Sequence, residues 1–181
     1  MGADLDKFSA QLIEEAKGFL SKATDSTTAE AEAANLHAAL MLAFCGLEGF
    51  INTRSQELSD KSTLSVHEKS VLLEKSVRLV DGTFQMQSTL QMWRPEDRIE
   101  FLHVRLGNKL VDKSADWWGQ LIEALHLRNE LTHAKNIPVI TRRAVEKAIL
   151  GIIGAIDALC RAIYTRKFPL AAFGLQCRKP F

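Results

Sequence analysis

Side chains suited to phosphate binding and proton transfer lie within six residues of each other in the segment Arg128-Asn129-Glu130-Leu131-Thr132-His133. Arg stays charged and grips phosphate with a planar fork. His gains or loses a proton near neutral pH. A fixed cation and a general acid or base are the groups that metal-free cleavage of a phosphodiester in RNA needs. We therefore take Arg128, Asn129 and His133 as candidate catalytic residues.

The spacing of Arg and His is a weak signal by itself. Eleven Arg and five His in 181 residues give about 0.3 chance matches to Arg-x4-His, and a second match runs from Arg98 to His103. Requiring Asn directly after Arg lowers the expectation to about 0.01, and only the match at Arg128 satisfies it. The alternative without chemistry is an Arg and a His that cap a helix end near Glu130.

Helix geometry predicts that one copy of the motif does not form a complete site. Five positions apart on a straight helix, Arg128 and His133 point about 140° away from each other and lie about 7.5 Å apart along the axis. Either the helix bends there, or a second subunit supplies the other half of a symmetric site. Asn129 and His133, at i and i+4, share a face, so Asn129 can orient the imidazole.

Four further side chains are candidates for supporting roles. Glu48 lies in an apolar stretch, where an unpaired acid is costly, so it either orients Arg128 or His133 or occupies a narrow solvent-facing strip. Lys135, Arg142 and Arg143 follow the motif and are candidate contacts to an RNA backbone. A solvated helix start is the ordinary alternative for these three cations.

Composition limits the class of protein. The chain is nearly neutral, with 23 Lys and Arg against 22 Asp and Glu, yet residues 128–181 hold ten basic and three acidic side chains, which suits a polyanionic ligand. Three separated cysteines without a CxxC pair fit a reducing cytosol. No cluster of ligands at metal spacing occurs, and the longest apolar stretches are too short to span a bilayer. We expect a cytoplasmic protein with no metal, cofactor or membrane association.

Apolar periodicity predicts helices almost throughout, and we find no convincing strand alternation. Thr27 with Glu30 and Ser65 with Glu68 are candidate capping boxes, and Pro95 is a helix-start signal. The third helix is predicted to run through Leu79 and to close at Gly82, and residues 83–94 are left unassigned. The predicted helices cover residues 4–22, about 28–58, 66–81, 95–110, 117–133 and 141–163. The expected fold is a single all-α domain over residues 1–181, a bundle of five or six helices with an apolar, basic tail at 168–181.

An all-helical domain whose penultimate helix ends in Arg-Asn-x-x-x-His, followed by a long apolar helix, resembles the HEPN family. The resemblance implies a symmetric homodimer in which two motifs face each other across a cleft. It also implies metal-independent cleavage of single-stranded RNA, with His133 as general acid or base for attack by the 2′-hydroxyl and Arg128 stabilising the phosphoryl oxygens.

Many members act as toxins or in defence or RNA processing, with an antitoxin or another protein as partner. Other members have lost activity and bind nucleic acid, nucleotide or protein, and this is the alternative function. Some groups carry a Tyr that a partner nucleotidyltransferase modifies, and Lys135 stands at that position here.

Overall fold

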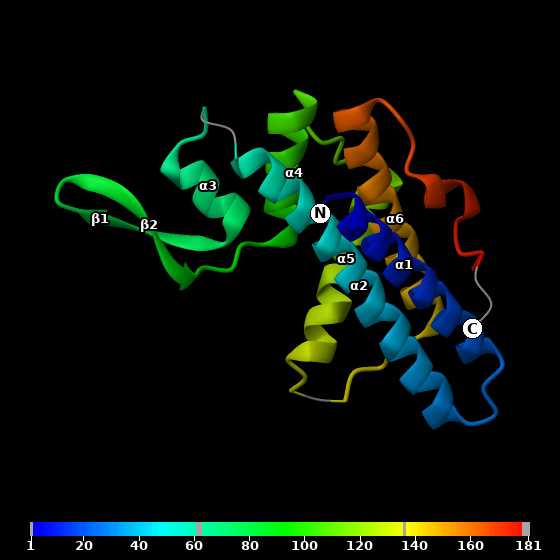
Figure 1. Ribbon diagram of the computed structural model, residues 1–181. Coiled ribbons are helices and arrows are strands. Elements are labelled where there is room, and N and C mark those ends of the chain that lie inside the picture. The colour runs from blue at the N-terminus through cyan, green and yellow to red at the C-terminus, as the bar shows by residue number, and fades with distance from the viewer. Residues whose placement is uncertain (1, 61–62, 136, 179–181) are drawn as a thin grey trace.

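The computed structural model describes residues 2–60, 63–135 and 137–178 and is mostly helical (Figure 1). Within these residues the elements follow one another along the chain as α1 Gly2–Thr24, α2 Ala29–Ser59, α3 Val66–Leu73, β1 Lys75–Val80, β2 Thr83–Leu90, α4 Pro95–Gly107, α5 Asp116–Thr132, α6 Arg142–Tyr164 and a 3-10 helix η1 Pro169–Phe173. The helical bundle is therefore confirmed in outline, and a small antiparallel sheet is added to it.

The core lies where α1, α2, α5 and α6 pack together, with α4 against α6. An apolar seam along α6, at Val145, Ile149, Ile152, Ile156 and Leu159, is completely buried inside this one chain. A seam of this kind can serve a bundle or a dimer, and here it serves the bundle. On α1, Leu12, Ala16 and Leu20 are buried, whereas Phe8 is 52% exposed.

Helix α2 runs through the middle of the bundle, as its apolar composition predicts. It is long and apolar enough to cross a membrane by length and composition, but half of its most apolar window is buried against the rest of the chain. Leu40, Leu47 and Ile51 are completely enclosed by neighbouring helices. These contacts are typical of a helix that is buried in a bundle.

Local capping signals account for several helix boundaries. Ser65 and Glu68 form the predicted capping box at the start of α3, and Pro95 opens α4 at the first helical position. The cap of α2 is Thr28, whose hydroxyl accepts from the Ala31 N–H at 3.1 Å. The predicted cap at Thr27 is therefore wrong by one residue, since the two threonines offer the same chemistry.

The prediction of a helix from Ser65 to Gly82 is wrong beyond Leu73. The chain leaves the helix at Glu74, which has φ +52°, and continues as a β-hairpin. Asp81 and Gly82 connect the strands, and both have positive φ (48° and 77°), as a two-residue type I′ turn requires. Asp-Gly flanked by β-branched and aromatic residues is a strong hairpin signal, and it outweighs the short apolar spacing that suggested a helix.

Two glycines of α6 bring α5 close to it and so position the end of α5. A Cβ atom on Gly151 would lie 2.7 Å from the Leu121 backbone nitrogen, and one on Gly154 would overlap Trp117. Trp117 stacks edge to face on Trp118, with ring centroids 5.5 Å apart. The tryptophans therefore pack at the α5–α6 contact.

The segment after α6 is anchored to α1, although no conformation was predicted for it. Lys17 is completely buried, and its ammonium group lies 2.5 Å from a carboxylate oxygen of Glu14. The same ammonium donates to the Gln176 carbonyl at 2.9 Å, and Glu14 accepts from the Arg178 N–H at 2.7 Å. One buried ion pair thus holds the last described residues on the surface of α1.

Candidate functional site

The motif occupies the last turn of α5, so its final residue lies at the boundary between helix and loop. His133 is the C-terminal cap of α5, and its backbone N–H donates to the Asn129 carbonyl at 2.9 Å. Residues 134, 135 and 137–140 lie outside helices and strands, and Thr141 is the N-terminal cap of α6. The imidazole of His133 is exposed as a result.

The end of α5 and the following loop form an open groove of about 510 Å³. Its polar lining includes the two motif residues that the i, i+4 spacing places on one face, Asn129 and His133. Lys135 contributes a cation to the same groove. The complete lining is His126, Asn129, Glu130, His133, Lys135, Ile137 and Pro138.

Arg128 lies on a different side of α5 and faces helix α2. Its guanidinium carbon is 5.3 Å from the centre of the Phe44 ring, and its nearest carboxylate oxygen, on Glu48, is 3.8 Å away. The side chain is 22% exposed and borders a smaller cavity of about 80 Å³. Arg128 and His133 of one chain therefore open into separate cavities, as the angle between five helical positions predicts.

Glu48 lies beside Arg128, with 47% of its side chain exposed. Because 3.8 Å is long for a charge-assisted hydrogen bond, this pair restrains the guanidinium only loosely. Glu48 lies neither in the core nor on a purely solvated strip. Whether it orients Arg128 for catalysis stays a prediction.

The second Arg-x4-His match has a structural role. Arg98 is 4% exposed and donates to Asn52, Ser55 and the Leu72 carbonyl, at distances between 2.9 and 3.1 Å. His103 is buried as well. Burial lowers the pKa of Arg98, against the opposing charges of Glu74 and Glu48. This arginine holds the base of the hairpin to the bundle, whereas Arg128 keeps one weak charged partner.

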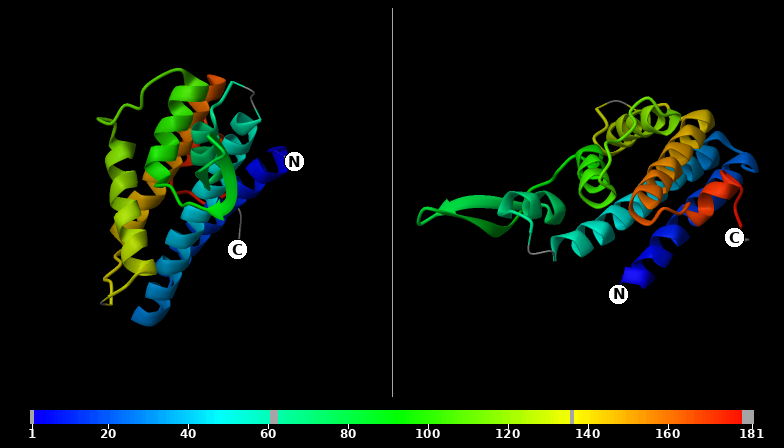
Figure 2. Two further views of the ribbon diagram at one scale, coloured as in Figure 1. Left: turned by 90° about the vertical axis from the view of Figure 1, so that its left-hand side faces the viewer. Right: turned by 90° about the horizontal axis from the view of Figure 1, so that it is seen from above.

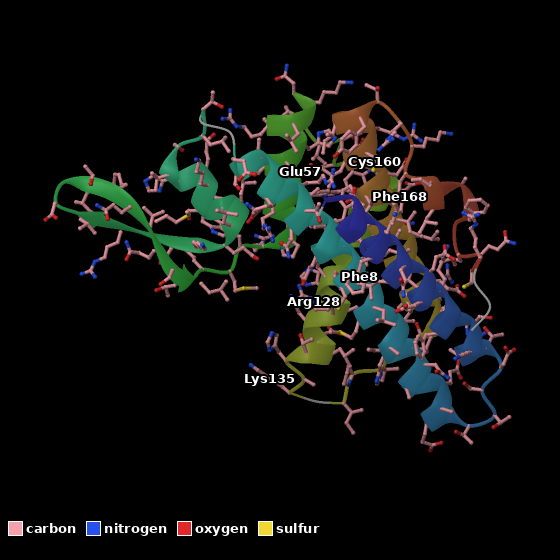
Figure 3. The ribbon with its side chains drawn as sticks, viewed as in Figure 1. Phe8, Glu57, Arg128, Lys135, Cys160 and Phe168 are labelled. Atoms are coloured by element: carbon pink, nitrogen blue, oxygen red, sulfur yellow. The ribbon has the colours of Figure 1, made fainter. Side chains whose placement is uncertain are left out.

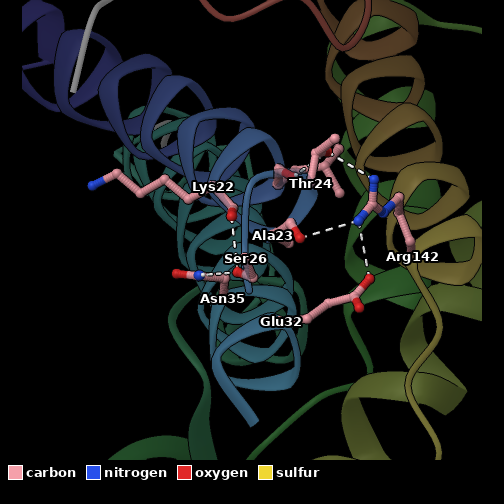
Figure 4. A network of polar contacts seen from close by, with 8 residues as sticks. Lys22, Ala23, Thr24, Ser26, Glu32, Asn35 and Arg142 are labelled. Atoms are coloured by element: carbon pink, nitrogen blue, oxygen red, sulfur yellow. Dashed lines mark hydrogen bonds and ion pairs between the residues drawn. The ribbon is translucent and has the colours of Figure 1, made fainter. Parts of the chain in front are cut away.

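The three cations that follow the motif occupy different environments. Lys135 lines the groove, and Figure 3 shows it beyond the end of α5, with Arg128 farther back along the helix. Arg143 is exposed at the start of α6. Arg142 instead ties α6 to α1 and α2, because it donates to Thr24, the Ala23 carbonyl and Glu32 (Figure 4). These bonds occupy Arg142, so an RNA contact is a poor account of this residue.

Neither of two cysteines is suited to act as a nucleophile. Cys45 is exposed, yet partial desolvation of its thiol, and then the charge of Glu48, raises its pKa. Burial, with a contribution from Asp157, raises the pKa of the Cys160 thiol to about 11. Since the thiolate is the reactive form, both groups are protonated at neutral pH. Among the residues that the structure describes, no group of three or more His, Cys, Asp or Glu side chains is placed to hold a metal ion.

Two residues that border the cavity beside Arg128 were not among the candidates. Trp93 and Glu74 reach it from the base of the hairpin; Trp93 lies in the stretch left unassigned, and Glu74 lies where a helix was predicted. Ile137 and Pro138 line the groove and were not candidates either. The Asp-Gly turn was the one local signal that could have located the hairpin and thereby Trp93 and Glu74.

The chain matches no protein-family model, and no curated protein or solved structure is significantly similar to it.

Proposed function

We propose that this protein is a metal-independent endoribonuclease of the HEPN type that acts on single-stranded RNA in the cytoplasm as a homodimer. The observation that carries the proposal is the groove at the end of α5, where Asn129 and His133 lie beside Lys135 in an opening of about 510 Å³. An exposed imidazole next to a cation suits a phosphodiester that must be bound and then exchange protons.

The proposal requires two copies because Arg128 and His133 of one chain border different cavities. A phosphate held at His133 of one copy needs its charge stabilised by an arginine from elsewhere. A two-fold axis near the end of α5 would bring Arg128 of the second copy towards His133 of the first. Each dimer would then have two equivalent pairs around one RNA strand.

The reaction is an in-line transesterification. His133 of one copy removes the proton from the ribose 2′-hydroxyl, and the 2′-oxygen attacks the adjacent phosphorus. The bond from phosphorus to the 5′-oxygen breaks, and this oxygen takes a proton from the imidazolium of His133 in the second copy. Arg128 stabilises the negative charge on the phosphoryl oxygens. The products are a 2′,3′-cyclic phosphate and a free 5′-hydroxyl.

Other side chains have supporting roles in this scheme. Asn129 orients the imidazole from the preceding turn, and Glu48 orients Arg128 from α2. Lys135 and the exposed Arg143 contact the RNA backbone on either side of the scissile bond. A toxin, defence or RNA-processing role, with an antitoxin or another protein as regulator, fits this chemistry.

The second candidate is a catalytically inactive helical module that binds nucleic acid, nucleotide or protein. The observation that favours it is the environment of Arg128, which is mostly buried, packed on Phe44 and paired with Glu48. In this alternative Arg128 stabilises the fold, and the groove binds a ligand without cleaving it.

Incubation of the purified protein with mixed-sequence single-stranded RNA in EDTA separates the two candidates. An enzyme yields fragments with 2′,3′-cyclic phosphate ends. An inactive module leaves the RNA intact and binds nucleic acid, a nucleotide or a protein. His126→Ala is a matched control for His133→Ala, because both imidazoles line the same groove. Uncleaved RNA over a broad range of substrates contradicts the enzyme.

A mixing experiment tests whether the site is shared. Arg128→Ala and His133→Ala each lack one half of every composite site and should be inactive alone. In a mixed dimer, Arg128 of one subunit and His133 of the other remain together while the second imidazole is missing, so part of the wild-type activity should return. If both halves of a site came from the same chain, mixing would restore nothing.

A further inference from the structure

The β-hairpin extends away from the helical bundle (Figure 2), and α3 packs against both of its strands. The strand register pairs Val77 with Met86 and Leu79 with Phe84, so these four apolar side chains share one face. Leu79 and Phe84 are 59% and 55% exposed, although His67 of α3 stacks on the Phe84 ring with centroids 4.7 Å apart. A two-stranded hairpin is marginally stable without further strands or a covering helix.

Strand β2 is an open edge without the usual protection. Its eight residues, Thr83–Leu90, contain no charged residue and no proline, and the sheet has no third strand. Proteins normally protect exposed edges with lysines, prolines or a covering element. The other strand does carry cations, Lys75 and Arg78. The asymmetry marks β2 as the edge that can accept another strand.

The backbone geometry identifies which groups of β2 are free. Val80 and Thr83 flank the two-residue turn, so they form a hydrogen-bonded pair, and the alternation of an antiparallel ladder then assigns Gln85 to the inward-bonding set. Phe84 and Met86 direct their N–H and C=O groups away from β1. Another strand can therefore bond to Phe84 and Met86 without disturbing the hairpin.

A second copy of β2 fits this edge. Antiparallel pairing centred on Gln85 places Phe84 of each copy opposite Met86 of the other, and those are the residues with free backbone groups. An aromatic side chain opposite an apolar one stabilises a cross-strand pair. Because β2 has no charge, self-pairing brings no like charges together, whereas self-pairing through β1 would bring cations together. The apolar faces of both hairpins would then form one continuous surface.

We propose that β2 pairs antiparallel with β2 of a second copy, centred on Gln85, and so joins two hairpins into a four-stranded sheet. A strand pair of this length buries less surface than a standard stable interface of about 1,200–2,000 Å². The association is therefore concentration-dependent. Association through β2 does not depend on the proposed RNA cleavage. It is tested by measuring molecular mass and amide hydrogen exchange, and activity is not needed.

Sedimentation measurements across a range of concentrations provide the first test. In the proposed register the two Gln85 side chains face each other, so Gln85→Lys and Gln85→Glu each place like charges together. Each variant should abolish association through β2 and leave only the dimer that the proposed function requires through α5. An equimolar mixture of the two variants should restore association through β2. Gln11→Lys makes the same substitution on an exposed face of α1 and should change nothing. Failure of the mixture to associate beyond either variant alone, or a wild-type mass independent of concentration, overturns the proposal.

Amide hydrogen exchange on the wild-type protein gives a second test that needs no variant. Gln85 should be protected at every concentration, because its N–H bonds to β1. The amides of Phe84 and Met86 should exchange freely when dilute and become protected in step with the rise in mass. If these two amides exchange freely in concentrated solution, the edge is unpaired and the proposal is wrong.

Discussion

The two ends of the motif differ in how firmly the fold holds them. Arg128 packs on Phe44 and lies near Glu48, in the angle between α5 and α2. His133, five residues later, caps the helix and projects into an open groove. Within one motif, Arg128 therefore contributes to the packing of the helices, and the side chain of His133 does not. Replacing His133 should therefore reduce activity but not stability, whereas replacing Arg128 should reduce both.

Replacing His133 should give the largest loss of activity with the smallest loss of stability. Removing a general acid or base typically costs about 10²- to 10⁴-fold in rate, whereas an exposed cap without side-chain packing contributes little to folding. RNA cleavage rates and thermal unfolding of His133→Ala measure both quantities. A clear fall in melting temperature would show that the imidazole is structural and remove the contrast with Arg128.

Replacing Arg128 should reduce both quantities. Losing electrostatic stabilisation of the phosphoryl oxygens costs about 10²- to 10³-fold in rate, and losing the contact with Phe44 costs about 0.5–1 kcal/mol in the free energy of unfolding. Arg128→Lys should recover little activity, because an ammonium group lacks the planar fork. Denaturant titration beside rate measurements tests this, with Arg78→Ala, at an exposed position of β1, as control. Full activity in Arg128→Ala would leave the residue with a structural role only.

Lys135 and Arg142 differ in the same way, because the first should affect RNA binding and the second should affect stability. Lys135→Ala should weaken RNA binding and lower the slope of log affinity against log salt by about 0.7, the value for one contact to a single strand. Arg142→Ala should leave that slope unchanged and lower stability, since it breaks the bonds to Thr24, Ala23 and Glu32. Binding titrations at several salt concentrations distinguish the two. Equal slopes for both variants would mean that Lys135 does not touch RNA.

Glu48→Gln should have the smallest effect. The carboxylate is half exposed and 3.8 Å from Arg128, and exposed pairs contribute about 0–1 kcal/mol. We expect unchanged stability and a decrease in rate of less than about tenfold. A loss as large as that of Arg128→Ala would instead make Glu48 essential for holding the guanidinium in place.

Sequence periodicity predicted the five long helices, α1, α2, α4, α5 and α6, and the relation between the motif residues. The spacing of Asn129 and His133 predicted one shared face, and both line the groove. Periodicity failed where the decisive interactions join distant parts of the chain. Arg142 bonds to residues about 110 positions away, which no local pattern reveals.

The hairpin was missed for a different reason. Its apolar residues are few, so helical and strand spacings fit them about equally well over so short a run. The positive φ values at Asp81 and Gly82 decide between the two, and they follow from the turn type rather than from hydrophobicity. Because the hairpin was not predicted, Trp93 and Glu74 were not expected beside Arg128, where they border the cavity.

The anchor between α1 and the last described residues makes this end of the chain sensitive to acid. Burial alone would raise the pKa of Glu14, but hydrogen bonds from Lys17 and from the Arg178 backbone outweigh it and leave the pKa below its ordinary value. A carboxylate with a lowered folded-state pKa stabilises the fold above its unfolded pKa, and that contribution disappears as the pH falls through the folded value. Only acid below the ordinary pKa of a glutamate, 4.5, should therefore detach Gln176 and Arg178 from α1 and let water reach Lys17.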